Sequence, residues 1–77
     1  MNAIEKILVD QIKEETGVSL KNFNVSGKSV SIIGYSEDDV KKVAEHIQSD
    51  GTVSLYHDAV FEDDGEFQYL ALVKKND

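Results

Sequence analysis

The sequence predicts a single small α+β domain, a two-layer sandwich in which two helices cover one face of a four-stranded antiparallel or mixed sheet, in the order α-β-β-α-β-β. Three observations predict it: two apolar stripes at helical spacing, four runs rich in β-branched and aromatic residues, and a tight-turn signal within each pair of runs. The chain has 77 residues, enough for one hydrophobic core. We therefore expect residues 1–77 to form one domain, with the last three residues frayed.

The first helix is expected over residues 3–15, with Asn2 as a candidate N-cap. Thr16-Gly17 provides the stop signal. Its predicted core face carries Ile4, Ile7, Leu8 and Ile12.

The second helix has the clearest start signal. The Ser36 hydroxyl can accept a hydrogen bond from the backbone N–H of Asp39, and three acidic residues in the first turn suit the positive end of the helix dipole. Gly51 can take the left-handed conformation that ends a helix. The predicted core stripe is Val40, Val43, Ala44 and Ile47.

Residues 18–25 alternate less regularly than the other strand candidates. Val18 and Leu20 share one phase, whereas Phe23 and Val25 share the other. Either a bulge or a late strand start would reconcile the two phases.

Gly27-Lys28 predicts a type II′ two-residue turn that joins the first two strands. The expected cross-strand pairs are Val25 with Val30 and Phe23 with Ile32. All four side chains then point to one face, as a core requires.

Asp64-Gly65 predicts a type I′ turn between strands at 52–61 and 67–74. This register pairs Val60 with Tyr69 and Tyr56 with Val73.

We expect one face of this hairpin to join the core, namely Leu55, Ala59, Phe61, Leu70 and Leu72. The opposite face is then an uncovered, candidate protein interface, formed by Ile33, Tyr35, Tyr56, Val60, Phe67, Tyr69 and Val73. A different loop length would exchange the two faces, and Lys or Glu stems could instead shield the exposed one.

The stretch at 15–20 resembles the stretch at 50–55, and each one follows a helix and begins a hairpin. The chain could therefore be two αββ halves related by a pseudo-twofold axis. Shared rules for stopping a helix and starting a strand explain the similarity equally well.

The charge is −7, and all eight basic residues are lysines. Arginine is the preferred bidentate reader of phosphate and guanine, so this composition argues against nucleic acid and anionic membrane as direct partners. An acidic patch is expected from Glu37, Asp38, Asp39, Glu62, Asp63, Asp64 and Glu66. Helix capping, a solvated turn and simple solubility are its alternative explanations. No apolar run approaches the length of a membrane span.

No catalytic, metal or cofactor site is expected. His46 and His57 are the only histidines, cysteine is absent, and no Gly-rich phosphate loop is present. Residues 62–65 lack the alternating oxygen donors of a calcium loop.

The stretch GVSLKNFNVSGKSVSIIGYSEDDVKKVAEHI, followed by a hairpin, resembles the permuted ferredoxin-like domains of bacterial pilus and type II secretion assembly proteins, of the PilN and GspL/GspM kind. The matching positions are Val18, Leu20, Val25, Val30, Ile32 and Gly34. That resemblance implies a non-catalytic domain that dimerises and contacts neighbouring assembly proteins. Part of the same stretch also resembles a BON domain. In size, charge and αβ make-up the chain is similar to small acidic phage inhibitors, such as uracil-DNA glycosylase inhibitor and some anti-CRISPR proteins.

These observations favour a protein–protein interaction module that binds another protein or itself as a homodimer. The alternative is an acidic inhibitor that mimics nucleic acid. A cytoplasmic location is expected for a complete chain, and an extracytoplasmic one for a fragment of an anchored assembly protein.

Overall fold

The computed structural model describes residues 3–77 and has the predicted α+β architecture. Asn2, the candidate cap of the first helix, lies outside the described residues. The elements in chain order are α1 (Ala3–Thr16), β1 (Asn22–Ser26), β2 (Ser29–Gly34), α2 (Glu37–Gln48), β3 (Val53–Asp63) and β4 (Glu66–Lys75).

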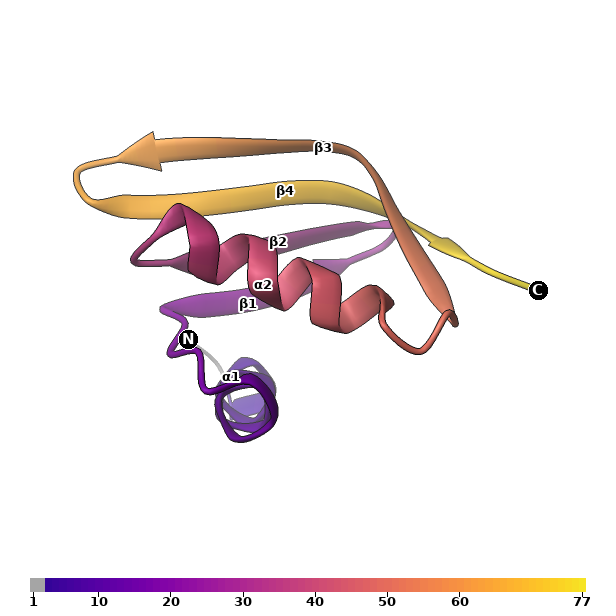
Figure 1. Ribbon diagram of the computed structural model, residues 1–77, viewed down its shortest axis with the longest axis horizontal. Helices are drawn as coiled ribbons and strands as arrows, with labels where there is room; N and C mark the ends of the chain where they lie inside the picture. The colour runs from indigo at the N-terminus through magenta and orange to yellow at the C-terminus, as the bar shows by residue number, and fades with distance from the viewer. Residues whose placement is uncertain (1–2) are drawn as a thin grey trace.

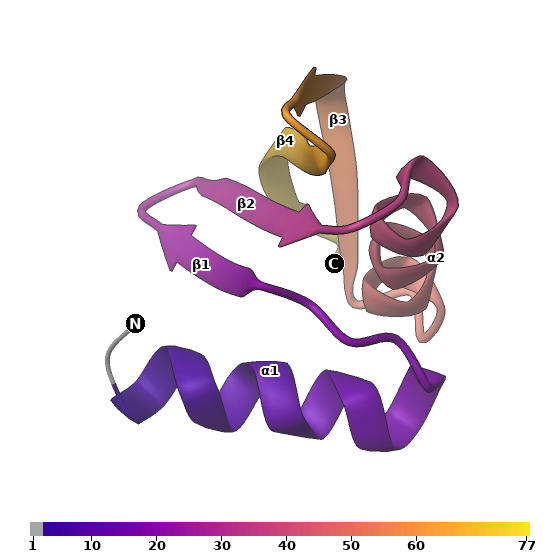
Figure 2. The same cartoon turned by 90° about the vertical axis from the view of Figure 1, so that its left-hand side faces the viewer.

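The four strands form one antiparallel sheet in the order β1-β2-β4-β3, and both helices cover the same face of it (Figures 1 and 2). Helix α2 packs on β2, β3 and β4, whereas α1 packs only on β1 and on α2. No helix within residues 3–77 is both long and apolar enough to span a bilayer.

The core lies between the sheet and α2, with α1 closing one side. Ile32, Val40 and Val43 are fully buried at its centre. The remaining buried side chains are Ile12, Val18, Leu20, Phe23, Val30, Ala44, Tyr69 and Ala71.

The first hairpin confirms the predicted turn and register. Val25 pairs with Val30, and Phe23 pairs with Ile32. Gly27 has φ 60°, as the first central position of a type II′ turn requires. The late strand start explains the phase change, because β1 begins only at residue 22 while Val18 and Leu20 enter the core from the preceding loop.

Helix α2 begins and ends as predicted. The Ser36 hydroxyl accepts a hydrogen bond from the Asp39 N–H at 3.1 Å, and Gly51 takes φ 78° beyond the last turn. These local signals fix the helix ends, and tertiary packing then buries its apolar stripe.

The predicted assignment of faces in the second hairpin is wrong. Tyr69 is only 4% exposed and lies in the core, with Val60, Phe67 and Val73 packed against it on the helix side. The reason is the pairing of β4 with β2, which sets Tyr69 opposite Ile32 and Ala71 opposite Val30. Directly opposed residues share a face of a sheet, so the buried side of β2 determines the buried side of β4.

Two smaller expectations also fail. Ile4 and Ile7 are 70% and 64% exposed, because the first half of α1 extends past the core that Ile12 enters. Asn76 is not frayed, since its N–H donates to the Thr52 carbonyl at 2.9 Å and its side chain donates to Gly51 O at 3.0 Å.

The strand order is symmetric about the centre of the sheet when the chain is divided into two αββ halves. The second strands of the halves, β2 and β4, pair antiparallel at the centre, and the first strands form the edges. The turn glycines that follow the two helices have nearly equal φ, 77° at Gly17 and 78° at Gly51. A duplication of one αββ unit stays a prediction.

Candidate functional site

A β-bulge at His57 and Asp58 divides β3 and decides which side chains face each way. Tyr56 pairs with Leu72, but the next regular pair is Ala59 with Leu70, so two residues of β3 are left without partners. His57 has φ 50°, a conformation that costs a non-glycine residue on the order of 1 kcal/mol. The predicted pair Tyr56–Val73 is therefore wrong by one residue, and Leu55 pairs with Val73 instead.

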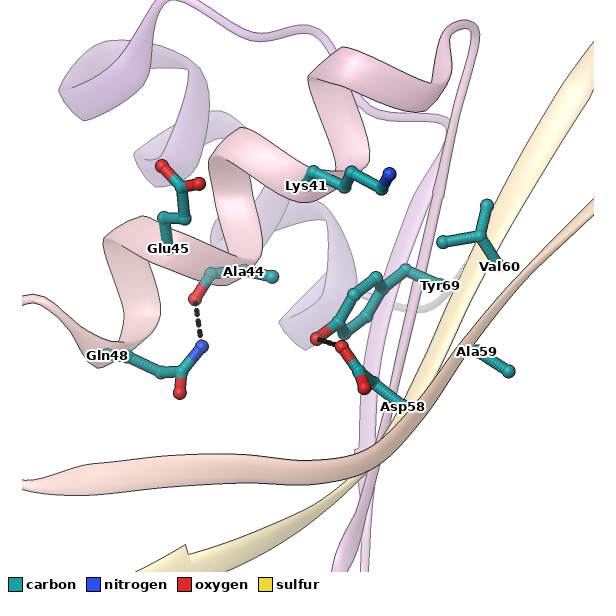
Figure 3. A pocket seen from close by; sticks show the side chains of 8 residues that line it. All are labelled: Lys41, Ala44, Glu45, Gln48, Asp58, Ala59, Val60 and Tyr69. Carbon is teal, nitrogen blue, oxygen red and sulfur yellow. Dashed lines mark hydrogen bonds between the residues drawn. The ribbon is translucent and has the colours of Figure 1, made fainter.

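The bulge turns the Asp58 carboxylate to the helix side, where it accepts a hydrogen bond from the Tyr69 hydroxyl at 2.8 Å (Figure 3). Burial, and then this hydrogen bond, raise the pKa of Tyr69 to about 12. A buried tyrosine needs a partner for its hydroxyl. Asp58 supplies that partner, so the sheet tolerates a tyrosine in its core face.

An open hollow of about 360 Å³ lies between α2 and this part of the sheet. Gln48 on its wall joins the two layers, because its amide donates to Ala44 O at 3.1 Å and accepts from the Leu55 N–H at 3.1 Å. Lys41 pairs with Glu37 at 2.7 Å, and that hydrogen bond raises the lysine pKa. Gln48, Lys41, Asp58 and Tyr69, which line the hollow, thus already make hydrogen bonds or ion pairs within the fold.

The two histidines lie in separate environments. His46 Nε2 is 2.9 Å from a Glu15 carboxylate oxygen, which joins α2 to α1 and lowers the pKa of Glu15. His57 is exposed, with its ring 5.1 Å from that of Tyr56. Among residues 3–77 no group of three His, Asp or Glu side chains is placed to hold a metal ion.

The side of the sheet away from the helices carries an apolar surface, here named the bare face. Phe61 is 55% exposed and Leu72 is 36% exposed. The alternation along β3 and β4 places five side chains on this surface, namely Tyr56, Ala59, Phe61, Leu70 and Leu72. Beside them, β1 turns polar side chains outward, because Asn22 pairs with Ile33 and Asn24 with Ser31.

The predicted interface residues are separated by the structure. Ile33 and Tyr56 lie on the bare side of the sheet, and Tyr35 is exposed just beyond the end of β2. The other four predicted residues, Val60, Phe67, Tyr69 and Val73, lie on the helix side. Four residues of the expected core, Ala59, Phe61, Leu70 and Leu72, form most of the bare face, while Leu55 packs against the core.

The predicted acidic residues gather at one end of the molecule. Gly34, three residues before α2, pairs with Phe67 next to the β3–β4 turn, and Figure 1 shows the start of α2 beside that turn. This acidic end comprises Glu37, Asp38, Asp39, Glu62, Asp63, Asp64 and Glu66. Lys41 pairs with Glu37 and Lys21 pairs with Glu66, so lysines offset part of the charge.

Three lysines gather at the opposite end of the long hairpin. Lys28, Lys74 and Lys75 line a hollow of about 430 Å³ together with Tyr56. These three lysines are named the basic end. The Val73 N–H donates to Lys28 O at 2.7 Å, which holds the first hairpin's turn against β4.

Sequence reasoning missed the bulge, for which the signal in the sequence is the polar pair His57-Asp58 in an otherwise apolar run. Leu55 and Val60 both face the helices but are five residues apart, an odd separation that an unbroken strand cannot give. The polar pair His57-Asp58 lies between them.

Comparisons of this chain with known protein families, with curated proteins and with solved structures gave no match.

Proposed function

We propose that this protein is a non-catalytic protein–protein interaction module that binds a partner chain through the bare face. One observation carries the proposal: Phe61 and Leu72 are exposed together on the sheet face opposite both helices of residues 3–77. The open face of an antiparallel sheet is commonly polar. Contiguous exposed apolar surface rimmed by polar residues is typical of interaction sites.

The energetics support the same proposal. Fully burying a phenylalanine side chain contributes about 1.5–3 kcal/mol, and roughly half of Phe61 is still available for burial by a partner. Phe61 also lies within a regular strand pair, opposite Gln68, so its backbone is already ordered before a partner binds.

A co-purification experiment with matched variants tests the proposal. Tagged wild-type protein, F61D and I7D are used as bait in a lysate of the organism that encodes the chain. Ile7 is the control because it is a similarly exposed apolar residue on α1. We expect a partner that wild type and I7D retain and folded F61D loses. Retention of every partner by F61D would refute a bare-face interaction.

A second candidate function is an acidic inhibitor that competes for the basic cleft of a nucleic-acid-binding protein. The gathering of seven acidic residues at one end favours it. Such binding depends on charge, so its association rate and affinity should fall steeply as salt rises. Affinity that changes little with salt, and is unaffected by D38N and D63N, would exclude this candidate.

A further inference from the structure

The bare face has opposite charges at its two ends. Asp63 pairs with Glu66 beside the turn, and Lys74 pairs with Ser54 at the far end of the hairpin. By strand alternation, the Asp63 and Lys74 side chains project on the same side as Phe61 and Leu72.

The Ala59–Leu70 pair lies midway between these charges. Asp63 lies four residues beyond Ala59, and Lys74 lies four residues beyond Leu70. At about 3.3 Å per residue, each charge is therefore about 13 Å from the central pair. The apolar residues follow the same symmetry, because Phe61 and Leu72 lie two residues from the centre on opposite sides.

From this symmetry we infer that the occupant of the bare face is a second copy of this chain, related by a twofold axis that runs between the faces, perpendicular to the strands, through Ala59–Leu70. The inference rests on the proposed binding role of the bare face. This axis reverses the strand direction of the second copy. It sets Phe61 of each copy over the Tyr56–Leu72 pair of the other, and Asp63 over the Ser54–Lys74 pair.

A face-to-face arrangement with parallel strands is disfavoured by charge. An axis parallel to the strands would set the acidic end of one copy over the acidic end of the other, and like charges in contact disfavour association. Pairing through the edge strand β3 is disfavoured as well, because its bulge interrupts the regular row of backbone donors and acceptors. A twofold contact uses one self-complementary patch on both copies, which matches the arrangement of the bare face.

We call this arrangement the crossed dimer, because the acidic end of each bare face lies over the lysine-bearing end of the other. Charge reversal gives a test that only the crossed dimer passes. Sedimentation equilibrium is measured for wild type, D63K, K74E and the double variant D63K/K74E. We expect wild type to dimerise and each single variant to do so about tenfold more weakly, because each reversal places like charges at both ends of the dimer. The double variant should regain wild-type affinity. An equimolar mixture of D63K and K74E should form a heterodimer, because both of its charge contacts are again opposite in sign.

Non-specific charge effects predict a different result. D63K makes the chain less acidic overall, so simple repulsion between acidic copies would strengthen its association, whereas the crossed dimer predicts weakening. F61D should abolish the dimer and I7D should leave it unchanged.

The remaining outcomes overturn the inference. A monomeric wild type, with a different protein bound in an F61D-sensitive manner, would refute the second copy but leave the proposed function standing. A dimer that F61D leaves intact would place the contact elsewhere, and a dimer lost in F61D but insensitive to D63K and K74E would refute the crossed orientation.

Discussion

Replacing Tyr69 with phenylalanine isolates one hydrogen bond in the core face of the sheet. The substitution removes the hydroxyl that donates to Asp58 at 2.8 Å and leaves the ring packing in place. A hydrogen bond to a charged group contributes about 1.5–3 kcal/mol. Asp58 is exposed and can be rehydrated, so we expect Y69F to lower the free energy of unfolding by about 1 kcal/mol at pH 7.

The same bond predicts a change with pH. The pKa of Tyr69 is raised from 10.0 to about 12, so the folded protein holds the phenol proton in a range where the unfolded chain releases it. The stabilisation is complete below pH 10 and is lost as the pH rises towards 12, by about 1.4 kcal/mol per pH unit. Y69F lacks this loss, so the advantage of the wild type over Y69F should vanish near pH 11.

Urea unfolding of both proteins between pH 7 and pH 11 measures the two effects. Y56F serves as the control, because Tyr56 lies exposed on the bare face, and its stability at pH 7 should stay within about 0.5 kcal/mol of wild type. Equal stabilities of wild type and Y69F at pH 7, with parallel decline up to pH 11, would refute the role assigned to the Tyr69–Asp58 bond.

Three further substitutions test the local structure, each by thermal or urea unfolding. S36A should lower the free energy of unfolding by about 1 kcal/mol, because it removes the hydroxyl that accepts a hydrogen bond from the Asp39 N–H. No change in stability would mean that the cap is unimportant. G34A should also cost about 1 kcal/mol, because its Cβ would lie 3.1 Å from Val40 Cγ1 in a packed core, and a gain in stability would show that the core can adjust. H57V should lower the free energy of unfolding by about 1–2 kcal/mol, because a β-branched residue is strained at the positive φ of the bulge, whereas H57G should not lower it. Equal stabilities of the two variants would contradict the bulge.

Local chemistry made the turns and helix ends predictable. Gly27-Lys28 and Asp64-Gly65 each specify a turn type through backbone conformations that few residues adopt, and both hairpins close at those turns. The N-cap at Ser36 is predictable for the same reason, because the residues that form it are neighbours in sequence.

The inner face of the second hairpin was not predictable in this way. Apolar content favours Phe61 and Leu72 over Tyr69 and Ala71 as core residues. The choice is instead made by the pairing of β4 with Ile32 on β2, a contact between segments more than thirty residues apart. The bulge adds a second non-local effect. It turns Asp58 to the helix side, where the carboxylate accepts the hydrogen bond of Tyr69 on the neighbouring strand. The candidate surface was therefore expected from the sequence, but most of its residues were assigned to the wrong side.

The limited packing of α1 has a consequence for how the domain opens. Since α1 contacts only β1 and α2, it can detach while the central strands keep their hydrogen bonds. Amide protons of α1 would then exchange with solvent through a partial opening of low free energy. Those of β2 and β4 would exchange only through global unfolding. We therefore expect α1 to open before the sheet does, and a protease to cleave α1 before it cleaves the strands.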